Sequence, residues 1–205
     1  MAGSLVRSAK EKSEMNLNEH KSALRKKIRA ALKNVSEETH KLDSEKLCIK
    51  LKEQSFFQNA SAILFFAPLP DEIDIWPLLE KLTYEKIAAL PCFDLDNQFY
   101  TSRQVKNLHA EIVSGHFGIR EPVGNCVEIP FDDLDLILVP GVAFDLHGNR
   151  LGRGKGFYDR LLQKIHCKKA GVCFDAQLLE KIPVEPHDAK VDFILTPSRC
   201  VATGG

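Results

Sequence analysis

The sequence predicts a single three-layer α/β domain with a mostly parallel or mixed central sheet flanked by helices. Short, continuous apolar segments alternate along the chain with segments of helical periodicity, which is typical of a sheet covered on both faces. The length of 205 residues suits one sizeable core, and no internal repeat is visible. We therefore expect one domain over residues 18–205.

Residues 1–17 are expected to form a disordered leader. They contain Arg7, Lys10 and Glu11 but lack the continuous apolar run of a secretory signal. No later segment approaches the roughly 18 apolar residues that a membrane span needs. These features favour a cytoplasmic protein without a membrane partner.

Two helices are expected at the start of the domain. Apolar or small residues recur at helical spacing from Asn18 to Leu32, and Asn18 is the expected cap of this first helix. Ser36, followed by two glutamates, is expected to cap a second helix, because its hydroxyl and the early carboxylates complement exposed amides.

Further elements follow from short apolar or periodic runs. Strands are predicted at 62–66, 87–90, 99–105, 134–139, 170–174 and 191–195. Helices are predicted at 74–82, capped by Asp74, and at 157–165, whereas residues 107–130 form the least regular region. Ligands of such folds bind beyond the carboxyl ends of strands, so the segment after 134–139 is the expected position of a site.

The composition limits the classes of partner. Lys and Arg number 28, and Asp and Glu also number 28, so no global field attracts nucleic acid or an acidic membrane. The six cysteines are scattered without a C-x-x-C pair, and most are expected to be reduced core residues. We expect a monomer that binds small molecules.

A glycine-rich, basic segment lies between a predicted core strand and a predicted helix. It comprises Gly152, Arg153, Gly154, Lys155 and Gly156. Flexible backbone with alternating cations suits phosphate oxygens, which need directed donors and positive charge. Gly156 stands where a Walker loop has serine or threonine, and the spacing differs from G-x-G-x-x-G. On composition alone, the segment could also be a surface turn with solvated charges.

The run from Asn149 to Asp159, NRLGRGKGFYD, closely resembles the signature of the 5-formyltetrahydrofolate cyclo-ligase family. One departure is Phe157, where many members carry tyrosine. Lys21-Ser-Ala-Leu-Arg25 is similar to the amino-terminal Lys-x-x-Leu-Arg of that family, although its spacing alone would indicate a solvated pair on one helix face. Residues 65–74, 117–122 and 187–192 are similar to further family segments.

The resemblance implies a role for each matching residue. ATP is expected at Lys21, Arg25, Asn149, Arg150, Gly152, Arg153, Gly154, Lys155 and Gly156. The reduced folate is expected at Glu72, Phe117, Phe157 and Tyr158, and Mg²⁺ is expected at Asp159 and Asp188. The expected catalytic residues are Arg153, Lys155 and Tyr158. Two carboxylates plus a triphosphate suit Mg²⁺, which prefers hard oxygen ligands.

The reaction that the resemblance implies converts 5-formyltetrahydrofolate and ATP into 5,10-methenyltetrahydrofolate, ADP and phosphate. Phosphorylation of the formyl oxygen would create a leaving group, and nitrogen 10 would then attack within the same molecule. Two other interpretations stay open. One is a non-catalytic domain that senses a phospho-ligand, and the other is an enzyme that acts on sugar phosphates without ATP or magnesium.

Overall fold

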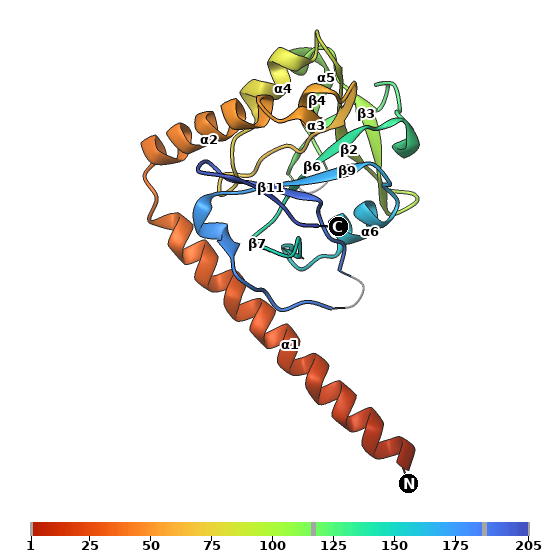
Figure 1. Cartoon of the computed structure of the whole chain (residues 1–205). Coiled ribbons are helices and arrows are strands. Elements are labelled where there is room, and N and C mark those ends of the chain that lie inside the picture. Colours follow the sequence, from red (N-terminus) through yellow and green to blue (C-terminus); the bar gives the residue numbers. More distant parts are fainter. Residues whose placement is uncertain (1, 116–117, 186–187, 205) are drawn as a thin grey trace.

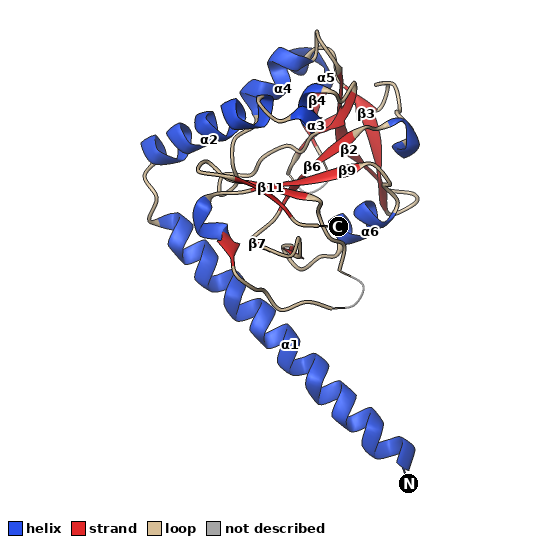
Figure 2. Ribbon diagram, viewed as in Figure 1, coloured by secondary structure: helices blue, strands red, loops and turns tan. Residues whose placement is uncertain are grey.

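The computed structural model describes residues 2–115, 118–185 and 188–204. A seven-stranded sheet lies between two layers of helices (Figures 1 and 2). Its strands, in spatial order, are β12 (Cys200–Ala202), β11 (Phe193–Leu195), β9 (Lys168–Val172), β6 (Leu136–Pro140), β1 (Ala62–Leu64), β2 (Ile87–Asp94) and β3 (Phe99–Gln104). The five inner strands are parallel, and the two edge strands are antiparallel to their neighbours. The predicted mostly parallel or mixed sheet is confirmed.

Alternating burial along the strands produces the three layers. In β6, Leu136 and Leu138 join one core cluster, while Ile137 and Val139 join the other. Successive strand residues point to opposite faces, so a continuous apolar run serves two cores at once. The first core packs under α2 (Glu37–Lys52), α3 (Ser55–Gln58) and α4 (Trp76–Leu82). The second packs against α6 (Phe157–Gln163).

The first helix is longer than expected. α1 runs from Ala2 to Lys33, and its N-terminal part projects away from the body (Figure 1). The expected start of this helix at Asn18 is therefore wrong. The sequence between residues 4 and 33 contains neither glycine nor proline and is rich in strong helix formers, so no residue stops the helix. Among the described residues, no helix is both long and apolar enough to cross a membrane.

The second helix begins as predicted, whereas the cap of α4 differs. The Ser36 hydroxyl accepts a hydrogen bond from the Thr39 amide at 3.1 Å and caps α2. α4 is preceded by Ile75 at the cap position, and Asp74 Oδ1 instead accepts from the Trp76 amide at 2.9 Å.

Several short elements were not predicted. They are α3, α5 (Leu108–Glu111), β4 (Ile112–Ser114), β5 (Arg120–Pro122), η1 (Phe131–Asp133), β7 (Ala143–Asp145), β8 (Arg150–Leu151), η2 (Asp175–Gln177), β10 (Leu178–Leu179) and the edge strand β12. β7 pairs with β8 and β10 in a small separate sheet, and β4 pairs with β5.

The strand order creates a crevice in the middle of the sheet. β1 is flanked by β2 on one side and by β6 on the other, and all three strands are parallel. The connections that follow β1 and β6 therefore diverge, which is where open α/β sheets bind ligands. The glycine-rich segment follows β6 through the β7–β8 hairpin and so lies at this crevice, as predicted.

Candidate active site

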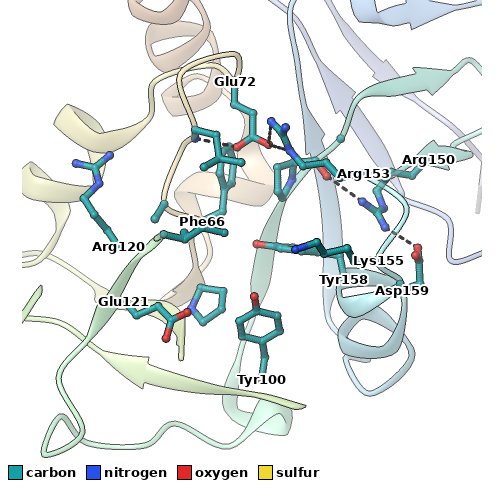
Figure 3. Close-up of a pocket in the computed structure, with 18 residues that line it drawn as sticks. Phe66, Glu72, Tyr100, Arg120, Glu121, Arg150, Arg153, Lys155, Tyr158 and Asp159 are labelled. Atoms are coloured by element: carbon teal, nitrogen blue, oxygen red, sulfur yellow. Dashed lines mark hydrogen bonds and ion pairs between the residues drawn. The ribbon is translucent and has the colours of Figure 1, made fainter. Parts of the chain in front are cut away.

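A cavity of about 270 Å³ opens beyond the carboxyl ends of β1 and β6 (Figure 3). The connection after β1 contributes Phe66, Leu69 and Glu72, and strands β2 and β3 contribute Pro91 and Tyr100. The opposite wall is formed by the glycine-rich segment and the first turns of α6, with Arg150, Gly152, Arg153, Lys155, Gly156, Tyr158 and Asp159. Segments far apart in sequence thus enclose one space with an apolar side and a basic side.

The backbone of the glycine-rich segment adopts conformations that glycine favours. Gly154 and Gly156 have φ angles of +97° and +68°, where a β-carbon would introduce strain. Gly156 directly precedes α6. The Gly152 carbonyl accepts a hydrogen bond from Arg25 Nε at 2.8 Å, so α1 supports the segment from outside the cavity. Lys155 is exposed and lines the cavity.

Arg153 crosses the cavity to the connection after β1. Its Nε and Nη2 atoms lie 3.2 and 3.0 Å from Glu72 Oε1, and Nη2 also forms an ion pair with Asp71. Glu72 Oε2 accepts from the Leu69 amide at 3.0 Å. Burial raises the pKa of Glu72 above its ordinary value, although the Leu69 amide and Arg153 act in the opposite direction. The residues expected for phosphate and for folate are therefore joined directly.

Arg150, which was expected to bind ATP, is buried at the base of the cavity. It is only 5% exposed, and its Nη2 donates to Asp159 Oδ1 at 2.5 Å. Its Nη1 donates to the Pro140 carbonyl at 3.2 Å, and its guanidinium carbon lies 5.7 Å from the Tyr158 ring centroid. Arg150 thus connects the end of β6 to two residues of α6 and orients both.

Asn149 does not line the cavity. Its side-chain amide donates to Asp145 Oδ2 at 2.9 Å, and Asp145 is fully buried. A buried carboxylate requires donors, which the Asn149 side chain supplies together with backbone amides of the same turn. The structure thus gives Asn149 a supporting place within the β7–β8 hairpin.

Two tyrosines line the inner wall. The ring centroids of Tyr100 and Tyr158 are 6.4 Å apart. Burial raises the pKa of Tyr158, and burial together with the charge of Glu121 raises the pKa of Tyr100 to about 12. Both phenols therefore remain protonated near neutral pH and can donate hydrogen bonds. Tyr100 was not predicted as a site residue, since its only sequence signal is its position in a strand next to the crevice.

Glu121 and Arg120 are two further cavity residues without a signal in the sequence. Glu121 is 6% exposed, and its Oε2 accepts from the Phe93 amide at 3.1 Å. Arg120 is exposed and stacks on Trp76, with its guanidinium carbon 3.6 Å from the ring centroid. Both lie in β5, within the region that was expected to be irregular.

Lys21 is not among the residues that line the cavity. It is 5% exposed, and its Nζ lies 2.7 Å from Glu185 Oε2 and 2.8 Å from Asp188 Oδ2. Lys21 therefore ties α1 to the segment before β11. Arg25, one helical turn later, is the residue of this pair that reaches the glycine-rich segment.

The two carboxylates expected at a metal each pair with a cation. Asp159 pairs with Arg150, and Asp188 pairs with Lys21. Burial lowers the pKa of Arg25, while the charges of Asp159 and Asp188 both act to raise it, so both carboxylates influence the same guanidinium. The described part of the chain contains no cluster of three or more His, Cys, Asp or Glu residues that could hold a metal by itself. An ion at these carboxylates would need further oxygen ligands, from water or from a bound substrate.

The expected contacts of Phe117 and Phe157 with folate involve side chains that the structure does not describe. Phe117 lies outside the described residues, and Phe157 begins α6, but its side chain is not described. Their expected contacts with folate stay predictions.

A sequence model described as the 5-formyltetrahydrofolate cyclo-ligase family matches residues 17–197. The chain belongs to this family. The cyclo-ligase of Mus musculus is 28% identical over 193 residues, which cover 88% of this chain and 95% of that protein. The cyclo-ligase of Escherichia coli K12 is 35% identical over 148 residues, which cover 68% of this chain and 80% of that protein.

Solved structures agree with the cyclo-ligase assignment. The NMR structure of Aquifex aeolicus 5,10-methenyltetrahydrofolate synthetase superimposes with a TM-score of 0.82 and 36% identity, covering 90% of this chain and 93% of that one. The synthetase of Mycoplasma pneumoniae, at 21% identity and a TM-score of 0.68, shows the same fold. This cyclo-ligase family member is therefore an enzyme of the ligase class that belongs to folate one-carbon metabolism.

Proposed function

We propose that this chain catalyses the ATP-dependent conversion of 5-formyltetrahydrofolate into 5,10-methenyltetrahydrofolate, ADP and phosphate. The observation that carries the proposal is that the family's glycine-rich segment forms the basic wall of a cavity whose other wall is aromatic. One side of this space suits phosphate oxygens, and the other suits a flat heterocycle.

The proposed chemistry has two steps. The γ-phosphoryl group of ATP passes to the formyl oxygen and leaves ADP. Nitrogen 10 then attacks the formyl carbon, the carbon–oxygen bond breaks with release of phosphate, and nitrogen 10 loses its proton. Because nitrogen 10 and the formyl carbon belong to one molecule, correct orientation supplies much of the rate. The mechanism requires no nucleophile from the protein.

The protein has to neutralise the charge of the phosphates and to orient the formyl group toward the γ-phosphate. Lys155 is assigned to the transferring phosphoryl group, because it is an exposed cation on the basic wall. Tyr158 is assigned to the formyl group as a protonated donor, with Arg150 as the residue that positions its ring. Arg153 is assigned to the phosphates of bound ATP and would exchange its carboxylate partners for phosphate oxygens.

Magnesium is part of the proposal as an ion shared between protein and nucleotide. Mg²⁺ is commonly held by one or two carboxylates together with substrate phosphates, so Asp159 and Asp188 have suitable chemistry. Bound there, the ion would neutralise phosphate charge. Asp159→Asn should shift the magnesium titration of activity to higher concentration, with rescue by excess magnesium. An unchanged titration would remove Asp159 from the metal site.

The decisive experiment measures the near-ultraviolet absorbance of methenyltetrahydrofolate after protein, 5-formyltetrahydrofolate, ATP and magnesium are mixed. Control reactions omit one component at a time. Growth of the band only in the complete mixture supports the proposed reaction. If folded protein binds ATP but produces no band and no steady release of ADP, the proposal is wrong, and a phospho-ligand sensor becomes the better interpretation.

A further inference from the structure

The proposed reaction creates a positive charge inside the cavity. The formyl oxygen takes the γ-phosphoryl group as ADP leaves, and nitrogen 10 then bonds to the formyl carbon. When the carbon–oxygen bond breaks, its electrons leave with the phosphate, which also takes the proton of nitrogen 10. The carbon is then bonded only to hydrogen and two nitrogens, so a neutral formamide has become an amidinium cation. Such a cation is costly in a partly closed cavity unless a carboxylate lies beside it.

The cavity as a whole disfavours a further cation. Its described lining includes four cationic side chains and three carboxylates, which are Arg120, Arg150, Arg153, Lys155, Glu72, Glu121 and Asp159. Asp159 is already paired with Arg150. The carboxylates that could stabilise the product are therefore Glu72 and Glu121.

Glu72 lies on the side of the cavity where the formyl group is expected. It is only 9% exposed and belongs to the connection that follows β1. Burial, and after it the charge of Glu72, raise the pKa of Tyr158, the residue assigned to the formyl group. The charge of Glu121 instead contributes to the raised pKa of Tyr100. Of the two carboxylates, Glu72 is therefore the one whose charge acts at the reacting group.

In the free protein, Arg153 supplies the positive charge beside Glu72. Figure 3 shows the two side chains joined by dashed lines, with Arg153 Nε and Nη2 at 3.2 and 3.0 Å from Glu72 Oε1. Burial raises the pKa of Glu72, while the Leu69 amide and Arg153 act to lower it, so the ionised carboxylate needs a positive partner. When Arg153 turns to the phosphates of ATP, Glu72 Oε1 loses this partner just before the reaction forms a new cation.

We propose that Glu72 is a catalytic residue whose negative charge stabilises the cation formed at the formyl carbon, in the place that Arg153 occupies in the free protein. This role rests on the proposed function, because that reaction produces the cation. The charge favours the cation over the neutral formamide. It therefore stabilises the transition state and the product more than the substrate, which is the condition for a higher kcat.

The first test compares the dissociation constants of 5,10-methenyltetrahydrofolate and 5-formyltetrahydrofolate by titration calorimetry. Both ligands carry the same pterin and glutamate, so the ratio of the two constants isolates the charge at the formyl carbon. A non-hydrolysable ATP analogue and magnesium are present, so that Arg153 is drawn to phosphate. Glu72→Gln keeps the size of the side chain but removes its charge, and it should shift the ratio by about tenfold or more against the methenyl compound.

Asp71→Asn is the matched control for this ratio. Asp71 forms an ion pair with the same Arg153 but, unlike Glu72, does not line the cavity. Its replacement changes the pairing of Arg153 while the charge inside the cavity stays. The ratio of the two dissociation constants should therefore remain within about twofold of the wild-type value.

The second test measures turnover in the absorbance assay. Glu72→Gln should lower kcat by about tenfold or more and raise the KM for 5-formyltetrahydrofolate by less, because the substrate does not carry the charge that Glu72 stabilises. Glu72→Asp keeps the charge on a shorter side chain and should recover part of kcat. A residue that only held the folate in place would instead raise KM and leave the ratio of dissociation constants unchanged.

The outcomes separate this role from the proposed reaction. Binding of 5-formyltetrahydrofolate by Glu72→Gln shows that the variant is folded. An unchanged ratio in this variant, with cyclisation by the wild type, would overturn the role of Glu72 and leave the reaction intact. An equal shift in Asp71→Asn would show a general charge effect and would also overturn the role. Absence of cyclisation by the wild type would overturn the reaction and the catalytic role of Glu72 together.

Discussion

Replacement of Lys21 by methionine should destabilise the protein although the long apolar stem is retained. The ammonium pairs with Glu185 at 2.7 Å and with Asp188 at 2.8 Å, and the Lys21 side chain is 7% exposed. Lys21→Met would leave two carboxylates without this cation. The stem of a lysine packs like an apolar side chain, so methionine isolates the loss of charge.

The expected loss of stability in Lys21→Met depends on how exposed Glu185 and Asp188 are. Removal of one partner from a fully buried ion pair costs about 3–5 kcal/mol. The side chains of Glu185 and Asp188 are 26% and 12% exposed, so water screens part of the penalty. We expect a loss of about 2–3 kcal/mol in the free energy of unfolding, which corresponds to a Tm lower by about 5–10 °C in a domain of this size.

The stabilisation that Lys21 provides should depend on pH in a defined direction. Burial alone would lower the pKa of Lys21, but hydrogen bonds and charges from Asp188 and Glu185 raise it above its ordinary value. Because the folded pKa exceeds the unfolded pKa, the stabilisation is fully present below about pH 10 and is lost as the pH rises through the folded pKa.

Urea denaturation at neutral pH measures this effect, with Lys27→Met, an exposed change on the same helix, as the control. Equal unfolding free energies for Lys21→Met and Lys27→Met would refute the reasoning. Retention of the wild-type KM for ATP by folded Lys21→Met would further show that this lysine does not bind the nucleotide.

Three other outcomes are expected. Lys155→Ala should remove most turnover in the absorbance assay while leaving the unfolding free energy within about 1 kcal/mol of wild type, since the side chain is exposed; normal turnover would remove its assignment. The pKa of Tyr100 is raised to about 12, so the alkaline difference spectra of the wild type and Tyr100→Phe should coincide up to about pH 10 and diverge above it. The stabilisation that comes from the protonated Tyr100 phenol should be lost as the pH rises through about 12. Gly171→Ala would place a β-carbon 2.6 Å from the Phe144 ring and should cost about 1–3 kcal/mol in thermal or urea unfolding.

The central strands could be predicted from sequence because their burial is nearly complete. Residues 136–139 form an unbroken apolar run, which a strand between two cores requires. β12 has no such signal, because Cys200–Ala202 is a short, partly exposed edge strand that depends on pairing with β11. The start of α1 was missed for a related reason: a polar segment has no apolar face from which a helix boundary can be read.

The candidate site could be predicted only as far as its local motif extends. The glycine-rich segment is contiguous in sequence, so its position after β6 was foreseeable. The ion pair between Arg153 and Glu72 joins residues 81 positions apart, and nothing in either local sequence indicates it. The same holds for the side chain of Asn149, which faces Asp145 because this buried carboxylate in the same turn needs its amide.

Arg153 connects the two sides of the cavity through its contacts with Glu72 and Asp71. In the free protein its guanidinium is held by Glu72 and Asp71, so an anion that recruits it must first compete with these internal carboxylates. A ligand that occupies Glu72 lowers this competition, and thermodynamic linkage requires that an anion on Arg153 favours that ligand to the same degree. If ATP and the folate bind as proposed, the affinity for one of them would therefore depend on whether the other is already bound.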